Sequence, residues 1–304
     1  MARPIIIDTD PGIDDAVAIL LALASPELEI EGIVAVAGNL PLGITERNAR
    51  AICELAGRPD IGVYAGCSVP MTRAPITAEH FHGESGLGTL TLPLPAMKLQ
   101  AQHGVDFTVE RLREAVPKSV TWCALGPLTN LALALVKAPD IVAGVAELVL
   151  MGGASRALGN VTPAAEFNIH ADPHAAEIVF DSGLPITVVP LDVTHQVRST
   201  PERIARIAAL GTKAASAVAG LLRPSGAGPD ALHDPCVIAY LLAPELFQGS
   251  RVNVAIECDS ALTLGMTVVD WRGVSGRQVN ANVLQGVDAD GVYALLIERI
   301  ARLS

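Results

Sequence analysis

The chain has 304 residues, of which 50% are hydrophobic and 17% are charged, and its formal net charge at pH 7 is −11. That length suits one or two domains, and the apolar content is sufficient for a large core and a subunit interface. The negative charge, without any basic run, argues against a nucleic-acid or anionic-membrane partner.

Three features of the sequence bear on its location in the cell. The longest apolar run, residues 16–24, is too short to cross a bilayer. One arginine and a short strand precede Asp8, which differs from the pattern of a secretory signal peptide. The five cysteines are scattered, odd in number and without a C-x-x-C pair. We therefore expect reduced, mostly buried thiols in a cytoplasmic protein.

Short apolar runs typical of strands alternate with runs of helical periodicity along most of the chain. The predicted strands are residues 4–8, 28–37, 61–64, 119–125, 147–151 and 186–190. The predicted helices are residues 13–24, 46–56, 127–137, 173–182 and 201–222, with a later helix beginning at the His-Asp pair 233–234. This alternation predicts βαβ units and an open, mostly parallel, Rossmann-like sheet with helices on both faces.

The pattern changes after Gln248. Residues 251–257, 263–270 and 278–282 resemble strands joined by glycine turns, and residues 287–303 form a final predicted helix. These strands could extend the sheet or form a small appendage. Because no internal repeat or long linker interrupts the chain, we expect residues 1–304 to form one α/β domain with a small C-terminal β extension.

Polar residues gather where predicted strands end. Asp8, Asp10, Asp14 and Asp15 follow the first strand in the segment "IIIDTDPGIDD". Such crowded carboxylates need protonation, a basic partner or a bound cation. Arg47 and Arg50 could approach in space, and Asp14, Asp15 or Asp234 could be ordinary helix caps, but one helix needs only one cap. A hard cation with oxygen ligands explains the whole cluster, and Ca²⁺ accepts such a set more readily than Mg²⁺.

Other strand ends carry Asn39, the segment "LGPLTN" at 125–130, the segment 151–168 and the pair His233-Asp234. In an open parallel sheet these ends share one edge, so the loops should meet there over a ligand.

The motifs together resemble the nucleoside hydrolases of the inosine–uridine-preferring type. The resemblance spans nearly the whole chain, in order, through "DTDPGIDDA" (8–16), "AGN" (37–39), "HGESGLG" (82–88), "ALGPLTNLA" (124–132), "MGG" (151–153), "GNVTPAAEFNIHADPHAA" (159–176) and "LHDPCVIAYLL" (232–242). It implies hydrolysis of the N-glycosidic bond of ribonucleosides, a bound Ca²⁺ and a dimer or tetramer.

The resemblance also implies roles for individual residues. The Ca²⁺ ligands would be Asp10, Asp15, Asp234 and the backbone carbonyl of Leu125. Asp10 would also be the general base, and His233 would lie beside the nucleobase. The remaining substrate-binding residues would be Asp14, Asn39, His82, Met151, Asn160, Glu166 and Asn168. The other histidines, His80, His103, His170, His174 and His195, are expected to be ordinary surface or core residues.

These roles suit the chemistry. Hydrolysis of an N-glycosidic bond passes through an oxocarbenium-like sugar, which anionic carboxylates stabilise. A cation orients a water and the vicinal hydroxyls, and Asp10 accepts the proton of that water. His233, whose ordinary pKa is near neutral, could protonate or hydrogen-bond the departing base.

Base preference is expected to depend on residues 221–234, "LLRPSGAGPDALHD", which contain neither an aromatic residue nor glutamine. Purine-preferring members stack the base on aromatic rings, whereas pyrimidine-specific members place Tyr and Gln in this region. We therefore expect broad specificity, for purine and pyrimidine salvage. Pro224, Gly226, Gly228 and Pro229 suggest a flap that closes over the substrate.

Two other functions fit parts of the pattern. Haloacid-dehalogenase-like phosphatases also have Asp-x-Asp after a first strand, but here Pro11 follows the second aspartate instead of glycine. A ribose- or nucleoside-binding protein without turnover would share the pocket. Aryl phosphatase activity would support the former, and tight ribose binding without hydrolysis the latter.

Overall fold

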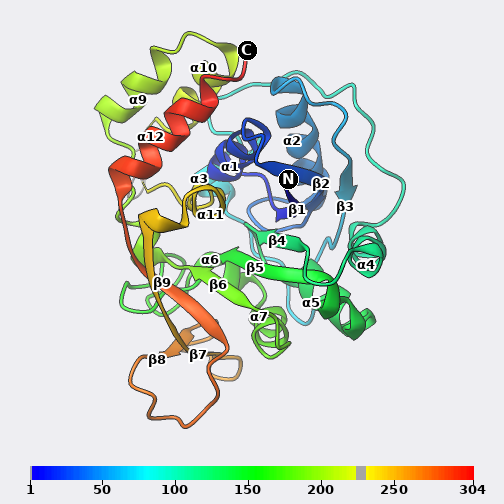
Figure 1. Ribbon diagram of the computed structural model, residues 1–304, viewed down its shortest axis with the longest axis vertical. Helices are drawn as coiled ribbons and strands as arrows, with labels where there is room; N and C mark the ends of the chain where they lie inside the picture. Colours follow the sequence, from blue (N-terminus) through cyan, green and yellow to red (C-terminus); the bar gives the residue numbers. More distant parts are fainter. Residues whose placement is uncertain (1, 224–230) are drawn as a thin grey trace.

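The computed structural model describes residues 2–223 and 231–304. Its centre is a mixed sheet with the strand order β3-β2-β1-β4-β5-β6-β9-β7-β8 (Figure 1). The strands from β3 to β9 in that order run parallel, whereas β7 is antiparallel to both β9 and β8. The strands are β1 Arg3–Thr9, β2 Leu28–Ala35, β3 Val63–Ala65, β4 Val120–Ala124, β5 Val145–Met151, β6 Ile186–Val189, β7 Phe247–Ile256, β8 Thr267–Asp270 and β9 Ala281–Val287.

Helices cover both faces of this sheet, as the sequence predicted. In β1, Ile5 and Ile7 pack into one buried cluster with α1, α2, α10, α11 and α12, while Ile6 packs into a second cluster with α4, α5 and α7. This division follows from the alternation of side chains along a strand. The helices are α1 Ile13–Leu23, α2 Leu42–Leu55, α3 Glu79–His82, α4 Gly104–Glu114, α5 Thr129–Lys137, α6 Phe167–Ala171, α7 Pro173–Phe180, α8 Leu191–Thr194, α9 Pro201–Ala208, α10 Lys213–Leu221, α11 Pro235–Leu242 and α12 Ala289–Ile300, with 3-10 turns at Pro139–Gly144 and Pro244–Leu246.

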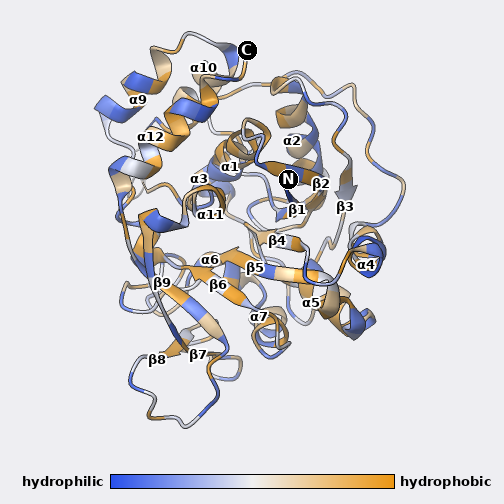
Figure 2. Cartoon of the chain, in the orientation of Figure 1, coloured by the Kyte–Doolittle hydropathy of each residue, from blue (hydrophilic) through white to orange (hydrophobic). Residues whose placement is uncertain are grey.

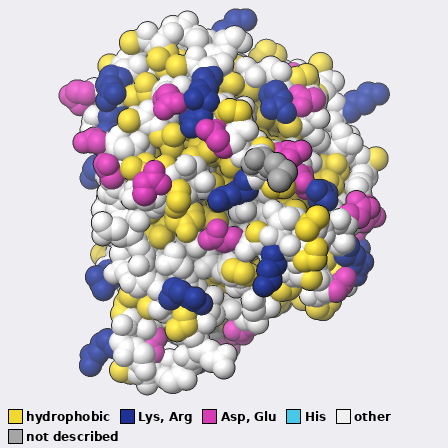
Figure 3. Space-filling model, in the orientation of Figure 1, with side chains coloured by type: hydrophobic (Ala, Val, Ile, Leu, Met, Phe, Trp, Pro, Cys, Tyr) yellow, Lys and Arg dark blue, Asp and Glu magenta, His cyan; other side chains and the backbone are white. Residues whose placement is uncertain are grey.

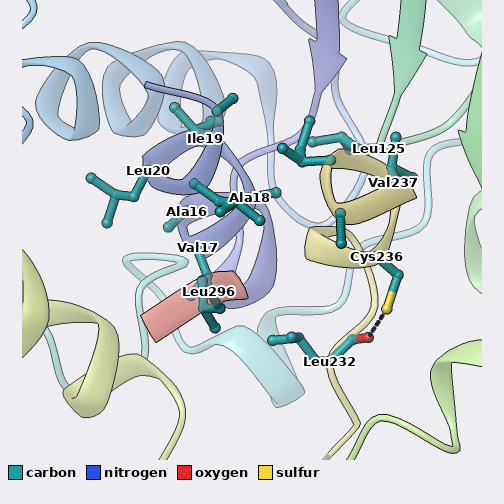
Figure 4. Packing of buried hydrophobic residues seen from close by; sticks show 14 of the residues in the cluster. Ala16, Val17, Ala18, Ile19, Leu20, Leu125, Leu232, Cys236, Val237 and Leu296 are labelled. Carbon is teal, nitrogen blue, oxygen red and sulfur yellow. Dashed lines mark hydrogen bonds between the residues drawn. The ribbon is translucent and has the colours of Figure 1, made fainter. Parts of the chain in front are cut away.

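Helix α1 lies inside the molecule and packs against α2, α10 and α11. Its residues from Ala16 to Ala22 are at most 1% exposed, and Figure 4 shows the first five of them, Ala16 to Leu20, in a cluster with Val237 of α11 and Leu296 of α12. Full burial of each Val, Leu or Ile side chain contributes roughly 1.5–3 kcal/mol. This packing fixes the N-terminus of α1, and with it Asp14 and Asp15, against the end of β1.

One predicted helix is wrong as a single element. Residues 201–222 form two helices, α9 and α10, because Gly211 has φ +72° and Thr212 caps α10 by accepting a hydrogen bond from the Ala215 amide at 3.1 Å. A positive φ suits glycine and ends a helix, whereas a threonine cap begins one. Helical periodicity alone did not reveal this break.

The C-terminal strands extend the sheet. Strand β9 pairs in parallel with β6, and β7 and β8 continue the sheet as an antiparallel pair that projects from the main body (Figure 1). The third C-terminal strand was predicted at 278–282 but runs from Ala281 to Val287. In Figure 2, β5 and β6 are mostly hydrophobic, as strands covered on both faces should be.

Charged side chains of both signs are scattered over the face of the molecule in Figure 3, with apolar side chains between them. Across residues 2–223 and 231–304, none of the helices combines the length and the apolar character that crossing a bilayer requires.

Candidate active site

A cavity of about 350 Å³ opens at the carboxyl ends of the parallel strands. Segments from distant parts of the sequence meet there, as expected for an open parallel sheet. Each residue expected to bind substrate lines the cavity, together with His233, Asp234 and Leu125. Its lining residues are Asp14, Asn39, Ala78, His80, Phe81, His82, Leu125, Met151, Asn160, Val161, Glu166, Phe167, Asn168, His195, His233 and Asp234.

The four aspartates of the opening motif do not form one group. Asp8 lies within β1 on the same face as Ile6, and its Oδ2 accepts a hydrogen bond from Asn130 Nδ2 at 3.0 Å. Thr9 lies on the other face, where its hydroxyl donates to Asp15 Oδ1 at 2.6 Å. The alternation of side chains along the strand therefore separates Asp8 from Asp15, and Asp10 lies one residue beyond the end of β1.

Asp15 has both a capping role and a place in the cluster. Its Oδ2 accepts hydrogen bonds from the Gly12 amide at 3.0 Å and from Asn39 Nδ2 at 3.1 Å. The expectation that an aspartate caps α1 is thus correct for Asp15. Asp234 is different, because it precedes Pro235 but forms no side-chain capping bond.

Asp14, Asp15 and Asp234 each place a carboxylate oxygen within 4.8 Å of the others. Asp10 lies beneath the cavity and is fully buried. Its Oδ2 accepts a hydrogen bond from the Asn39 amide at 2.6 Å, whereas its Oδ1 is buried without a hydrogen-bond partner among the described residues.

Two glycines make room for the Asp10 carboxylate. A Cβ atom added at Gly38 would lie 2.1 Å from Asp10 Oδ2, and one added at Gly126 would lie 2.5 Å from Oδ1. Any side chain at either position would collide with the carboxylate. Both glycines therefore permit the close approach of β1 to the loops after β2 and β4.

Burial and mutual repulsion raise the pKa of these acids. Burial raises the pKa of Asp10 well above its usual 3.8, and the charge of Asp15 raises it further. Burial, followed by Asp14 and Asp15, raises the pKa of Asp234 in the same direction. Among residues 2–223 and 231–304, no ion pair joins these acids to a Lys or Arg, and Arg50 pairs with Glu46 instead.

An unpaired, buried oxygen on Asp10 and three further carboxylates fit a hard divalent cation with oxygen ligands. A cation would remove the repulsion that otherwise favours protonation of the cluster.

The loop between β5 and α6 carries the residues expected to bind the sugar. Glu166 caps α6 by accepting hydrogen bonds from the amides of Asn168 at 2.9 Å and Ile169 at 3.2 Å, and it also binds the Gly153 amide at 3.0 Å. Asn160 Oδ1 accepts a hydrogen bond from the Phe167 amide at 2.9 Å. Asn160 and Glu166 therefore both stabilise the backbone of this loop and line the cavity.

Asn168 links this loop to the expected cation ligand at Leu125. Its Nδ2 donates to the Leu125 carbonyl at 2.7 Å and to the Met151 carbonyl at 3.1 Å. A carbonyl has two lone pairs, so the Leu125 oxygen retains one for another partner.

The lining of the cavity includes His82 and His233, the two histidines that we expected in the site. His82 Nδ1 accepts a hydrogen bond from the Ile13 amide at 3.1 Å, at the start of α1. Nδ1 of His233 lies 2.8 Å from the Thr194 hydroxyl. Burial and then His195 lower the pKa of His233 to about 4, so its ring is neutral at pH 7. A neutral ring can donate a hydrogen bond but is a weak proton donor.

The sequence analysis missed several lining residues. His80 and His195 were assigned ordinary surface or core roles, and Phe81 and Phe167 were not considered, yet all four line the cavity. The His195 ring lies 5.9 Å from that of His233, in an edge contact. His195 follows the carboxyl end of β6, so the rule that located the other segments could have identified it. The expected flap at Pro224, Gly226, Gly228 and Pro229 lies outside the described residues.

The chain was compared with known protein families, curated proteins and solved structures. Residues 5–294 match the family model described as inosine-uridine preferring nucleoside hydrolase. The pyrimidine-specific ribonucleoside hydrolase RihA of Shewanella sp. is 46% identical, over 99% of this chain and 97% of that protein. An uncharacterized protein of Schizosaccharomyces pombe is 50% identical, over 98% and 99% respectively. The solved structure of a purine-preferring ribonucleoside hydrolase from Gardnerella vaginalis superimposes with a TM-score of 0.91 at 33% identity, covering 98% of each chain.

Proposed function

The chain belongs to the family of inosine-uridine preferring nucleoside hydrolases, and from this premise we propose how its cavity works. It is a nucleoside N-ribohydrolase, and we infer that Ca²⁺ and Asp10 are essential to its reaction. The observation that carries this proposal is the unpaired Oδ1 of Asp10, buried among further carboxylates beneath a cavity large enough for a nucleoside.

The cation would be held by Asp10, Asp15, Asp234 and the carbonyl of Leu125. When bound, it would neutralise the cluster, orient a water and the sugar hydroxyls, and lower the pKa of that water. Calcium is our choice because it accepts six to eight oxygen ligands in flexible geometry. The carboxylates and amide carbonyls present here are oxygen donors of that type.

Asp10 is the proposed general base. The water oxygen forms the new bond at C1′ of the ribose while its proton moves to Asp10. The C1′–N bond breaks, and its electron pair moves to the nucleobase, which then takes up a proton. The carboxylates of Asp14 and Asp15 would stabilise the positive charge that develops on the sugar ring.

The sugar is proposed to lie between two groups of lining residues. Asp14, Asn39 and Asn168 would hold the 2′- and 3′-hydroxyls. Asn160 and Glu166 would hold the 5′-hydroxyl, with Met151 packed against the ring. Because Glu166 and Asn168 are already fixed by backbone hydrogen bonds, little side-chain entropy would be lost when the sugar binds.

His233 is proposed to assist the departing base. Its neutral ring would donate a hydrogen bond to the base as the electron pair arrives there, and His82 also lines the cavity. Broad specificity remains our proposal. The relatives support both halves of it, since one is named pyrimidine-specific and another purine-preferring.

A cytoplasmic location and a homo-oligomeric state complete the proposal. All five cysteines are unpaired, which suits a reducing compartment. The apolar composition leaves hydrophobic surface for contacts between subunits, in a dimer or a tetramer.

The decisive experiment measures release of reducing sugar from inosine, uridine, cytidine and adenosine, with and without a chelator. We expect turnover of both purine and pyrimidine nucleosides, lost on chelation and restored by Ca²⁺. Ribose binding without hydrolysis of any of the four would overturn the proposal. The same assay on an aryl phosphate is expected to show no turnover.

A further inference from the structure

The hydroxyl of Thr194 faces the imidazole of His233, and this contact suggests how that ring is prepared for the leaving-group step. Thr194 is fully buried at the end of α8, and its Oγ1 lies 2.8 Å from Nδ1 of His233. The two residues are 39 positions apart in the chain. This inference rests on the proposed function, because it concerns the histidine that would assist the departing base.

Thr194 lies on α8, and hydrogen bonds of Asp192 hold this helix in place. The carboxylate of Asp192, in the same turn of helix, accepts hydrogen bonds from three consecutive backbone amides of the loop after β5. The donors are Ser155 at 2.8 Å, Arg156 at 2.6 Å and Ala157 at 3.1 Å. The position of the Thr194 hydroxyl is therefore fixed relative to the loop that carries the proposed sugar-binding residues.

The imidazole of His195 lies beside that of His233 and restricts the rotation of the His233 ring. The rings of His195 and His233 are 5.9 Å apart and inclined at 66°. His195 Nε2 is buried and has no hydrogen-bond partner among the described residues, so its contact with His233 is between the rings and not through a hydrogen bond. Thr194 is the group that occupies Nδ1 of His233, which leaves Nε2 as the nitrogen available to a ligand in the cavity.

We infer that Thr194 is a positioning residue for His233: its hydroxyl donates to Nδ1 and so keeps the ring proton on Nε2, directed at the nucleobase. The hydrogen bond at one ring nitrogen determines which tautomer is present. An Nε2–H group donates to an oxygen or nitrogen of the base, whereas an unprotonated Nε2 would repel the electron pair that arrives there. The wrong tautomer alone can greatly slow an enzyme that relies on histidine.

The test compares two leaving groups in two variants. Thr194→Val removes the hydroxyl at nearly constant volume, and Thr194→Ser retains it. Uridine needs help with its leaving group, whereas 4-nitrophenyl riboside releases a stable phenolate without help. For Thr194→Val we expect kcat on uridine to fall about 10- to 100-fold, with kcat on the nitrophenyl riboside within about threefold of wild type. Thr194→Ser should restore most of the activity on uridine.

A merely structural role gives different results. Equal losses on both substrates would overturn the inference, as would a further loss when Thr194→Val is added to His233→Ala. Nitrogen-15 NMR of the imidazoles provides a readout that is independent of activity. It should find the Nε2–H form of His233 in the wild type and a mixture of tautomers in Thr194→Val. If the wild type hydrolyses neither substrate, the proposed function fails, whereas the tautomer of His233 is still measured by NMR.

Discussion

The two ends of the sheet hold cavities that differ in size and in chemistry. A groove of about 1050 Å³ at the amino ends of β5, β6 and β9 is lined by Glu147, Asp181, Arg251 and Arg277 among other residues. Its two arginines and Asp181 are exposed, and Glu147 accepts a hydrogen bond from Thr187. The cavity at the carboxyl ends is about one third of that size, yet buried carboxylates surround it. Uncompensated buried charge, and not volume, marks the site where binding energy is available.

A similar contrast exists at the end of β1. Asp8 and Asp10 are two residues apart and both fully buried, and in each the Oδ2 accepts one amide hydrogen bond while the Oδ1 has no partner among the described residues. They differ in their neighbours, because the charges of Asp15 and Asp14 act on Asp10, whereas Asp8 is bonded to Asn130 of α5. One carboxylate belongs to the packing of the sheet, and the other to the site. Five predictions test these two contrasts.

The largest effect is expected for Asp10→Asn. Asparagine retains the shape of the side chain but loses the charge and the basic oxygen, so kcat should fall by roughly 10²–10⁴. Reducing-sugar release from inosine and uridine measures this, and circular dichroism checks that the fold is intact.

Asp8→Asn is the matched control, because it is the same change in a buried carboxylate two residues earlier, which is bonded to Asn130 of α5 and has no acidic neighbour among the causes of its pKa shift. Its activity should remain within about tenfold of wild type, since an amide oxygen can still accept the hydrogen bond from Asn130. Equal losses in the two variants would contradict the assignment of Asp10 as the base.

Ca²⁺ should stabilise the folded protein. A ligand at 100 times its Kd stabilises by about 2.7 kcal/mol, which for a chain of this length raises the Tm by roughly 4 °C. Thermal unfolding with chelator and with excess Ca²⁺ measures the shift. Asp234→Asn should lose most of it, and a full shift in that variant would remove Asp234 from the ligand set.

Without divalent cations, stability should fall as pH rises. The pKa of Asp10, Asp15 and Asp234 is raised in the folded state above the usual 3.8, mainly by burial. Between these values the folded state binds more protons than the unfolded state, so the free energy of unfolding decreases with increasing pH. Below the ordinary histidine pKa of about 6.5, the lowered pKa of His233 acts in the opposite direction. We therefore expect the loss, about 1–2 kcal/mol, above that pH in chelator, measured by urea unfolding. A flat profile in chelator would contradict the prediction, and Ca²⁺ should reduce the slope.

The smallest effect is expected at the other end of the sheet. Arg251→Ala and Arg277→Ala change exposed side chains of the larger groove, and each should alter nucleoside turnover by less than about twofold and stability by less than about 0.5 kcal/mol. A large loss of turnover in either variant would make the groove part of the functional site.

Much of this molecule follows from local sequence. The alternation of apolar strands with helical segments correctly predicted the parallel sheet covered on both faces, since burial on both sides requires continuous apolar strands. The boundaries were less certain, as at residues 201–222, where one glycine with positive φ divides a predicted helix into α9 and α10. The expectation that the loops after the strands meet at one edge agrees with the structure, in which Asn39, Asn168 and His233 line the same cavity.

Other features depended on the tertiary structure. The sequence by itself determined which residue types stand at strand ends, because backbone geometry and side-chain periodicity are local properties. It could not show that Asp8 and Asp10 serve different purposes, that Thr194 meets His233 across 39 residues, or that His195 borders the cavity. Those contacts arise only when helices from distant parts of the chain pack on the sheet, since long-range packing fixes the distances between side chains that no local pattern encodes.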